Sequence, residues 1–66
     1  MQATKSFAEV QELIENYVER LVFCSPSHVI YETSSLYKAE LCKELLKNYS
    51  AYTVTKDGKW FVSVPL

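Results

Sequence analysis

The chain has 66 residues, a net charge of −1 at neutral pH and a hydrophobic fraction of 48%. This length suits one small domain, residues 1–66, and the apolar content excludes a disordered chain. The balanced charge excludes a strong general attraction to nucleic acid. No stretch reaches the roughly 20 apolar residues of a membrane-spanning helix, and residues 1–5 lack the apolar core of a signal peptide. We therefore expect a cytoplasmic domain without membrane contact.

A first helix is predicted from a capping-box pattern at Ser6–Glu9. Apolar residues then recur from Phe7 to Leu21 at spacings of three and four, which is the period of an amphipathic helix. The pair Ser25-Pro26 predicts its end, because the residue before a proline avoids helical backbone. The opposite face carries three glutamates in a half of the chain that is acidic overall: Glu12, Glu15 and Glu19.

The next segment, His28–Thr33, is short and rich in β-branched and aromatic residues, which favours a strand. A second interpretation stays open. Ser25 could cap a helix that begins at Pro26, since proline is common at the first helical position.

A second helix is predicted to begin after the candidate N-caps at 33–35 and to run from Leu36 to about Asn48. A hairpin follows it. Residues 52–56 and 59–64 flank Asp57-Gly58, a favoured two-residue turn because both of its positions need positive φ. This turn sets the register of the two strands.

The predicted order is helix, strand, helix, strand, strand. It gives an α+β fold in which a three-stranded sheet carries two helices packed on one face, with residues 59–65 in the centre. Trp60, Val62 and Val64 share one side of their strand, which has more large apolar groups and no charge, and we assign it to the core. The opposite side is predicted to be open. If residues 26–32 are helical, the fold is instead a winged helix with three helices and a β-hairpin wing.

The sequence shows no catalytic or metal-binding set. His28 is the only histidine, and Cys24 and Cys42 carry neither a nucleophile signature nor the spacing of a zinc site. We expect both cysteines to be free, buried core thiols. Gly58 is the only glycine, which excludes a glycine-rich phosphate loop. We expect no enzyme activity, no cofactor and no metal.

The favoured function is a non-enzymatic protein-binding module, an accessory regulator or inhibitor of a larger protein. Apolar clusters on an open sheet face tend to mark interaction sites. The edge strand 52–56 could also accept an added strand, and a homodimer through the same face would relieve the small core. The candidate partner-binding residues are Tyr52, Val54, Phe61, Glu12, Glu15 and Glu19.

The alternative function follows from the winged helix, which would bind DNA through a recognition helix at Leu36–Asn48. Four lysines would contact phosphate: Lys38, Lys43, Lys56 and Lys59. Glu40 and Glu44 on the same helix count against it, because acidic side chains repel the phosphate backbone. A weaker alternative is single-stranded nucleic acid stacked on Tyr52 and Phe61.

Overall fold

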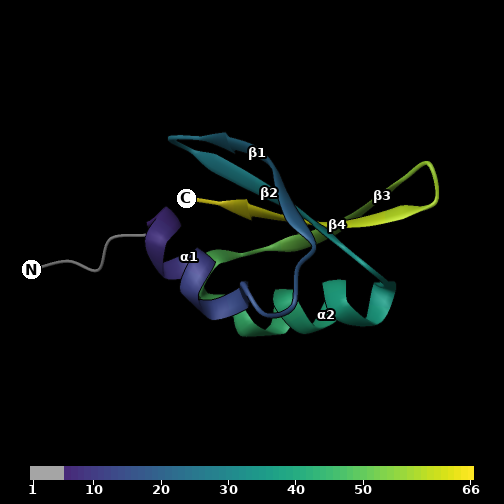
Figure 1. Cartoon of the computed structure of the whole chain (residues 1–66). Coiled ribbons are helices and arrows are strands. Elements are labelled where there is room, and N and C mark those ends of the chain that lie inside the picture. Colours follow the sequence, from purple (N-terminus) through teal and green to yellow (C-terminus); the bar gives the residue numbers. More distant parts are fainter. Residues whose placement is uncertain (1–5) are drawn as a thin grey trace, which may run out of the picture.

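A computed structural model of the chain describes residues 6–66, so the segment searched for a signal peptide, Met1–Lys5, lies outside the described residues. The elements in order are α1 (Phe7–Ile14), β1 (Arg20–Ser25), β2 (His28–Thr33), α2 (Leu36–Leu45), the 3-10 helix η1 (Lys47–Tyr49), β3 (Tyr52–Lys56) and β4 (Lys59–Pro65). The strands form one antiparallel sheet in the order β1-β2-β4-β3, with α1 and α2 on one side of it (Figure 1). The α+β class is confirmed, but the sheet has one strand more than predicted.

The first helix is much shorter than predicted. It begins as expected, with the Glu9 backbone N–H donating to the Ser6 hydroxyl at 3.2 Å, but it ends at Ile14. The prediction of a helix up to Ser25 is wrong, because Arg20–Ser25 is strand β1. Its apolar run contains Val22 and Phe23, which favour strands, and pairing with β2 outweighs the weak local helical period.

The β1–β2 hairpin turns at Pro26 and Ser27, with Ser25 opposite His28. The Ser25 hydroxyl donates to the His28 carbonyl at 3.2 Å, which ties the two sides of the turn together. The winged-helix architecture required a helix over residues 26–32. That alternative is wrong, since His28–Thr33 is a strand with its backbone paired to β1 and β4.

The β3–β4 hairpin has the predicted turn and register. Val54 lies opposite Phe61, and Thr55 lies opposite Trp60. Asp57 and Gly58 adopt φ values of 55° and 75°, as a two-residue turn of this kind requires. β4 is the inner strand between β2 and β3, as predicted.

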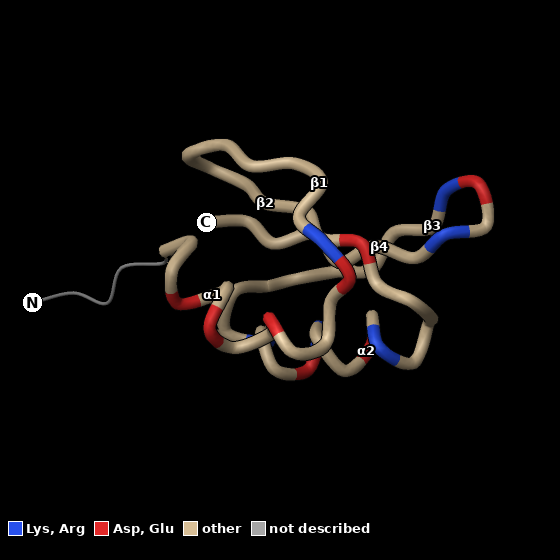
Figure 2. Tube along the Cα trace, viewed as in Figure 1, with Lys and Arg blue, Asp and Glu red and all other residues tan. Residues whose placement is uncertain are grey.

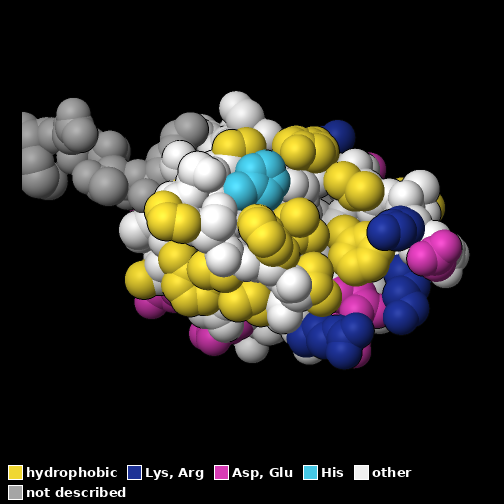
Figure 3. All heavy atoms as spheres, turned by 90° about the horizontal axis from the view of Figure 1, so that it is seen from above, with side chains coloured by type: hydrophobic (Ala, Val, Ile, Leu, Met, Phe, Trp, Pro, Cys, Tyr) yellow, Lys and Arg dark blue, Asp and Glu magenta, His cyan; other side chains and the backbone are white. Residues whose placement is uncertain are grey.

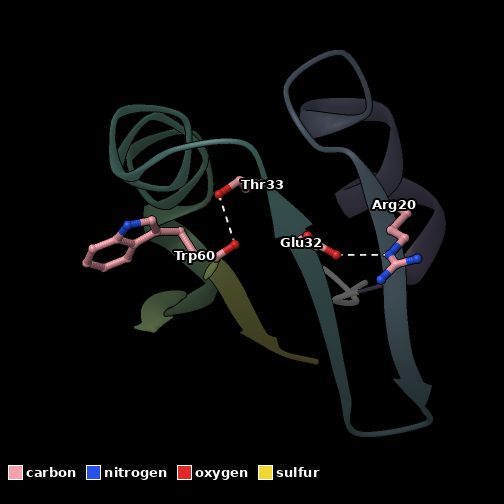
Figure 4. A network of polar contacts seen from close by, with 4 residues as sticks. All are labelled: Arg20, Glu32, Thr33 and Trp60. Atoms are coloured by element: carbon pink, nitrogen blue, oxygen red, sulfur yellow. Dashed lines mark hydrogen bonds and ion pairs between the residues drawn. The ribbon is translucent and has the colours of Figure 1, made fainter. Parts of the chain in front are cut away.

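The core lies between the sheet and the helices. Its members are buried and come from β2, β4, α1, α2, η1 and the residue between α2 and η1: Val29, Tyr31, Val62, Val64, Val10, Ile14, Cys42, Leu46 and Tyr49. The predicted core side of β4 is confirmed for Val62 and Val64, whereas Trp60 is only half-buried at the margin. There the Thr33 hydroxyl bonds the Trp60 carbonyl at 3.1 Å (Figure 4).

Two tyrosines connect α1 to the rest of the fold. The Tyr31 hydroxyl donates to Gln11 Oε1 at 2.6 Å, and the Tyr49 hydroxyl donates to Glu9 Oε1. An eight-residue helix is unstable alone, so these bonds and the packing of its apolar side hold it in place. Neither helix among residues 6–66 has the length and apolar character needed to cross a membrane.

Candidate protein-binding surface

The side of the sheet that faces away from the helices carries apolar side chains from all four strands. Their positions follow from the register, which puts Phe23 opposite Ile30 and Val54 opposite Phe61. We call this group the open-face cluster; its members are Val22, Phe23, Ile30, Tyr52, Val54 and Phe61. Figure 3 looks down on this side and shows apolar groups spread across it, with lysines at one end.

The outer members of the cluster are well exposed. Phe23 is 50% exposed, Tyr52 48%, Val22 41% and Val54 39%, whereas Ile30 and Phe61 on the inner strands are half-buried. Each exposed square ångström of apolar surface removed from water contributes about 25 cal/mol. Docking on this side therefore has a hydrophobic driving force.

A hollow in the cluster has a volume of about 270 Å³. Its lining is Val22, Ile30, Val54, Lys56 and Phe61, so four of the five residues are apolar. Pockets for small-molecule ligands usually start at about 300 Å³ and are more enclosed. The hollow has room for a single large side chain, and Lys56 adds one positive charge to its lining.

His28 lies at the edge of the cluster. Its Nε2 is hydrogen-bonded to the Ser63 hydroxyl, and its ring meets the Tyr52 ring edge-on, with centroids 6.2 Å apart and planes at 66°. A serine paired with histidine can act as a nucleophile only if substrate reaches the hydroxyl, and Ser63 is 2% exposed. We infer that this contact fixes the two rings rather than activating Ser63.

The six predicted partner-binding residues fall into two groups. Tyr52, Val54 and Phe61 come together on one side of the sheet, as predicted. The predicted acidic helix face does not exist as such, because α1 ends at Ile14. Glu12 lies on α1, Glu15 is its C-cap, and Glu19 precedes β1 and donates its backbone N–H to the Glu32 carbonyl at 2.7 Å.

The four lysines of the nucleic-acid alternative are also divided. Lys56 and Lys59 face each other at the end of the β3–β4 hairpin, on either side of the turn (Figure 2). Lys38 and Lys43 lie on α2, where Lys43 Nζ is 3.7 Å from the Glu40 carboxylate. Because residues 28–33 form a strand and not the third helix of a winged helix, the two lysine pairs do not form one DNA-binding surface of that kind.

Sequence reasoning missed half of the open-face cluster. Val22 and Phe23 were missed because the apolar spacing of the sequence predicts a continued helix where the structure has strand β1. Ile30 lies in a strand that the sequence predicts, and the sequence could also have shown which side it faces. Side chains alternate along β2, so burial of Val29 and Tyr31 turns Ile30 to the open side.

The two cysteines behave differently. Cys42 is fully buried in the core, and burial raises the pKa of its thiol to about 11. Cys24 is exposed on β1, which corrects the expectation that both thiols are buried. Both are free thiols in the described part of the chain.

No family model, curated protein or solved structure matches the chain.

Proposed function

We propose that the chain is a small, non-enzymatic protein-binding module that docks on a larger protein through the open-face cluster, as an accessory regulator or inhibitor. One observation carries the proposal: a single side of the sheet gathers apolar side chains from all four strands. An antiparallel sheet with one side on its core normally presents polar residues on the other side. A contiguous apolar surface there is typical of an interaction site.

The surface also favours one kind of partner chemistry. The 270 Å³ hollow accepts one apolar anchor, and Lys56 beside it attracts an acidic group next to that anchor. Arg20 on β1 is already engaged, with Nε 2.9 Å from Glu32 Oε1 (Figure 4). We therefore propose a partner segment with a large apolar side chain flanked by aspartate or glutamate.

The free thiols Cys24 and Cys42 support a cytoplasmic location, because reducing compartments keep cysteines unpaired.

The test is a binding experiment with matched lysine variants. Purified chain is used as bait in lysate, with and without nuclease, and captured proteins are identified by mass spectrometry. Val54→Lys places a charge in the cluster at a side chain that is already 39% exposed, whereas Tyr37→Lys does the same on α2, where the side chain is 73% exposed. We expect a specific protein that survives nuclease, is lost with Val54→Lys and is kept with Tyr37→Lys.

Two other results would contradict the proposal. Loss of the protein with the charge reversals Glu12→Lys, Glu15→Lys and Glu19→Lys, but not with Val54→Lys, would move the site to the acidic residues around α1. Capture that disappears with nuclease would favour single-stranded nucleic acid stacked on Tyr52 and Phe61. Circular dichroism of each variant checks that the fold is intact.

A further inference from the structure

The edge strand β1 is uncovered on both of its sides. Residues 20–24 are all exposed, and Ser25 is half-buried. Four consecutive residues of this strand, Leu21–Cys24, include no charge and no proline, and nothing among residues 6–66 pairs with its outer edge. An exposed apolar edge of this kind is a template for another strand. The other edge strand, β3, also exposes Tyr52 and Val54, but there they alternate with Thr53 and Thr55, and the strand ends at Lys56.

A β-bulge at Val22 changes which side each residue of β1 faces. The register shifts between Leu21 and Phe23, so that two residues of β1 oppose Ile30. Phe23 lies opposite Ile30, and Val22 lines the same hollow as Ile30, so both face the open side. Leu21 is opposite the core residue Tyr31 and therefore faces the helix side.

The ends of the strand follow the same rule. Arg20 and Ser25 lie opposite Glu32 and His28 on the open side, and Cys24 lies opposite the core residue Val29 on the helix side. From Arg20 to Ser25 the sides are open, helix, open, open, helix, open. This pattern is the same in both directions along the strand.

We propose that β1 pairs antiparallel with β1 of a second copy of the chain, about a two-fold axis between Val22 and Phe23, to form a continuous eight-stranded sheet. In this register Leu21 lies opposite Cys24 of the second copy, and Val22 lies opposite its Phe23. In every pair the two opposed residues then face the same side of the sheet. A slip of one or two residues would put an open-side residue against a helix-side residue.

The bulge and the charges fit this register. The extra residue that is mismatched against β2 meets an equal bulge in the second copy, so neither β1 strand has a residue left over. The one charge of the strand, Arg20, lies opposite Ser25 of the second copy and is already paired with Glu32 in its own chain. Cross-strand pairs at the centre are apolar, which stabilises a sheet.

The dimer does not depend on the open-face proposal, because β1 pairs through its backbone edge. A strand pair of this length lies at the low end of interface size, so we expect a reversible, concentration-dependent dimer. Sedimentation velocity of the whole chain over a range of concentrations measures it. A chain that stays monomeric at every concentration would overturn the proposal.

Matched lysine variants separate the edge from the face. Phe23→Lys puts a charge at the centre of β1. Both copies carry this charge in a two-fold dimer, so the dissociation constant of the dimer should rise about tenfold or more. Val54→Lys charges the opposite edge strand at the same side of the sheet and should leave the dimer unchanged. Equal weakening by both variants would show a dimer through the open face and would overturn the proposal.

A designed cross-link tests the register. Leu21→Cys puts a thiol opposite Cys24 of the second copy, and directly opposed residues of antiparallel strands have Cα atoms about 4.5–5.5 Å apart, within the range of a disulfide. Mild oxidation should give a covalent dimer that the double variant Leu21→Cys, Cys24→Ser does not give. Cys42 is buried, so it stays out of the reaction. A reversible dimer that Leu21→Cys cannot cross-link would overturn the register.

Discussion

Each of the two hairpins gives the sheet one inner strand and one edge strand, and the two edge strands differ. β3 is covered on one side, since α2 packs against both β3 and β4, and its exposed residues include threonine and lysine. β1 lies at the other edge, away from α2 in Figure 1, and is exposed along almost its whole length. The helix layer therefore packs against β2, β3 and β4 from one side, whereas both sides of β1 stay accessible.

The same difference predicts how stability is distributed. Val62 in β4 is fully buried between the sheet and the helices, whereas the side chains of β1 contribute mainly through their pairing with β2. Regions with few buried apolar contacts open at low cost, while core strands open only with the whole molecule. β1 is therefore the strand expected to open first.

A valine-to-alanine substitution should lower the free energy of unfolding much more in β4 than in β1. Val62→Ala removes two buried methyl groups from the centre of the core and should cost roughly 2–3 kcal/mol of unfolding free energy. Val22→Ala removes the same atoms from a side chain that is 41% exposed and should cost under about 1 kcal/mol. Urea unfolding, at concentrations below dimer formation, measures both. Equal losses would show that the β1 edge is as well packed as the centre.

A stability loss of roughly 2–3 kcal/mol, at about 1.4 kcal/mol per pKa unit, is expected at alkaline pH from the buried Cys42 thiol. Burial raises the pKa of Cys42 from 9.0 to about 11, because the thiolate would lose its water. Below pH 9 the thiol is neutral in both states and its contribution is fully present. As pH rises from 9 to 11 the unfolded chain loses this proton while the folded chain keeps it, so stability falls.

Tyr31 extends this loss to higher pH. Burial raises its pKa from 10.0 to about 12, with smaller effects of Cys24 and Glu15 in the same direction. In Cys42→Ala the decline should therefore begin about one pH unit later than in the unmodified chain. Cys24→Ala, on the uncovered strand, is the control and should keep the early onset. Thermal unfolding followed by circular dichroism between pH 8 and 12 checks the order, and the same onset in Cys42→Ala and the unmodified chain would contradict it.

The β3–β4 hairpin could be predicted from the sequence because its signals agree. Asp57-Gly58 specifies the turn, and regular alternation on each side specifies which residues face the core. From these signals the register and three members of the open-face cluster follow. The core also follows in part, since Val62 and Val64 share a side with no charge.

The β1–β2 hairpin could not be predicted in the same way, for two physical reasons. Leu21 continues the three- and four-residue spacing that Ile14 and Tyr17 begin, so the local pattern fits a longer helix. The bulge then places Val22 and Phe23 on one side, which removes the alternation that marks a strand. Only the pairing of β1 with β2, a tertiary interaction, decides between the two. Two of the six residues of the open-face cluster, Val22 and Phe23, depend on that pairing.

Substitutions in the two hairpin turns should change the free energy of unfolding least. Gly58 has a φ of +75° and open space around an added Cβ, so Gly58→Ala meets no clash and costs only backbone strain, about 1 kcal/mol. Gly58→Asn should cost less, because asparagine tolerates this backbone conformation. Pro26→Ala should cost about 0.5 kcal/mol, chiefly by loosening the unfolded chain. Urea midpoints rank the three variants. If Pro26→Ala lowered stability more than Gly58→Ala, the β1–β2 turn would constrain the sheet more than the β3–β4 turn.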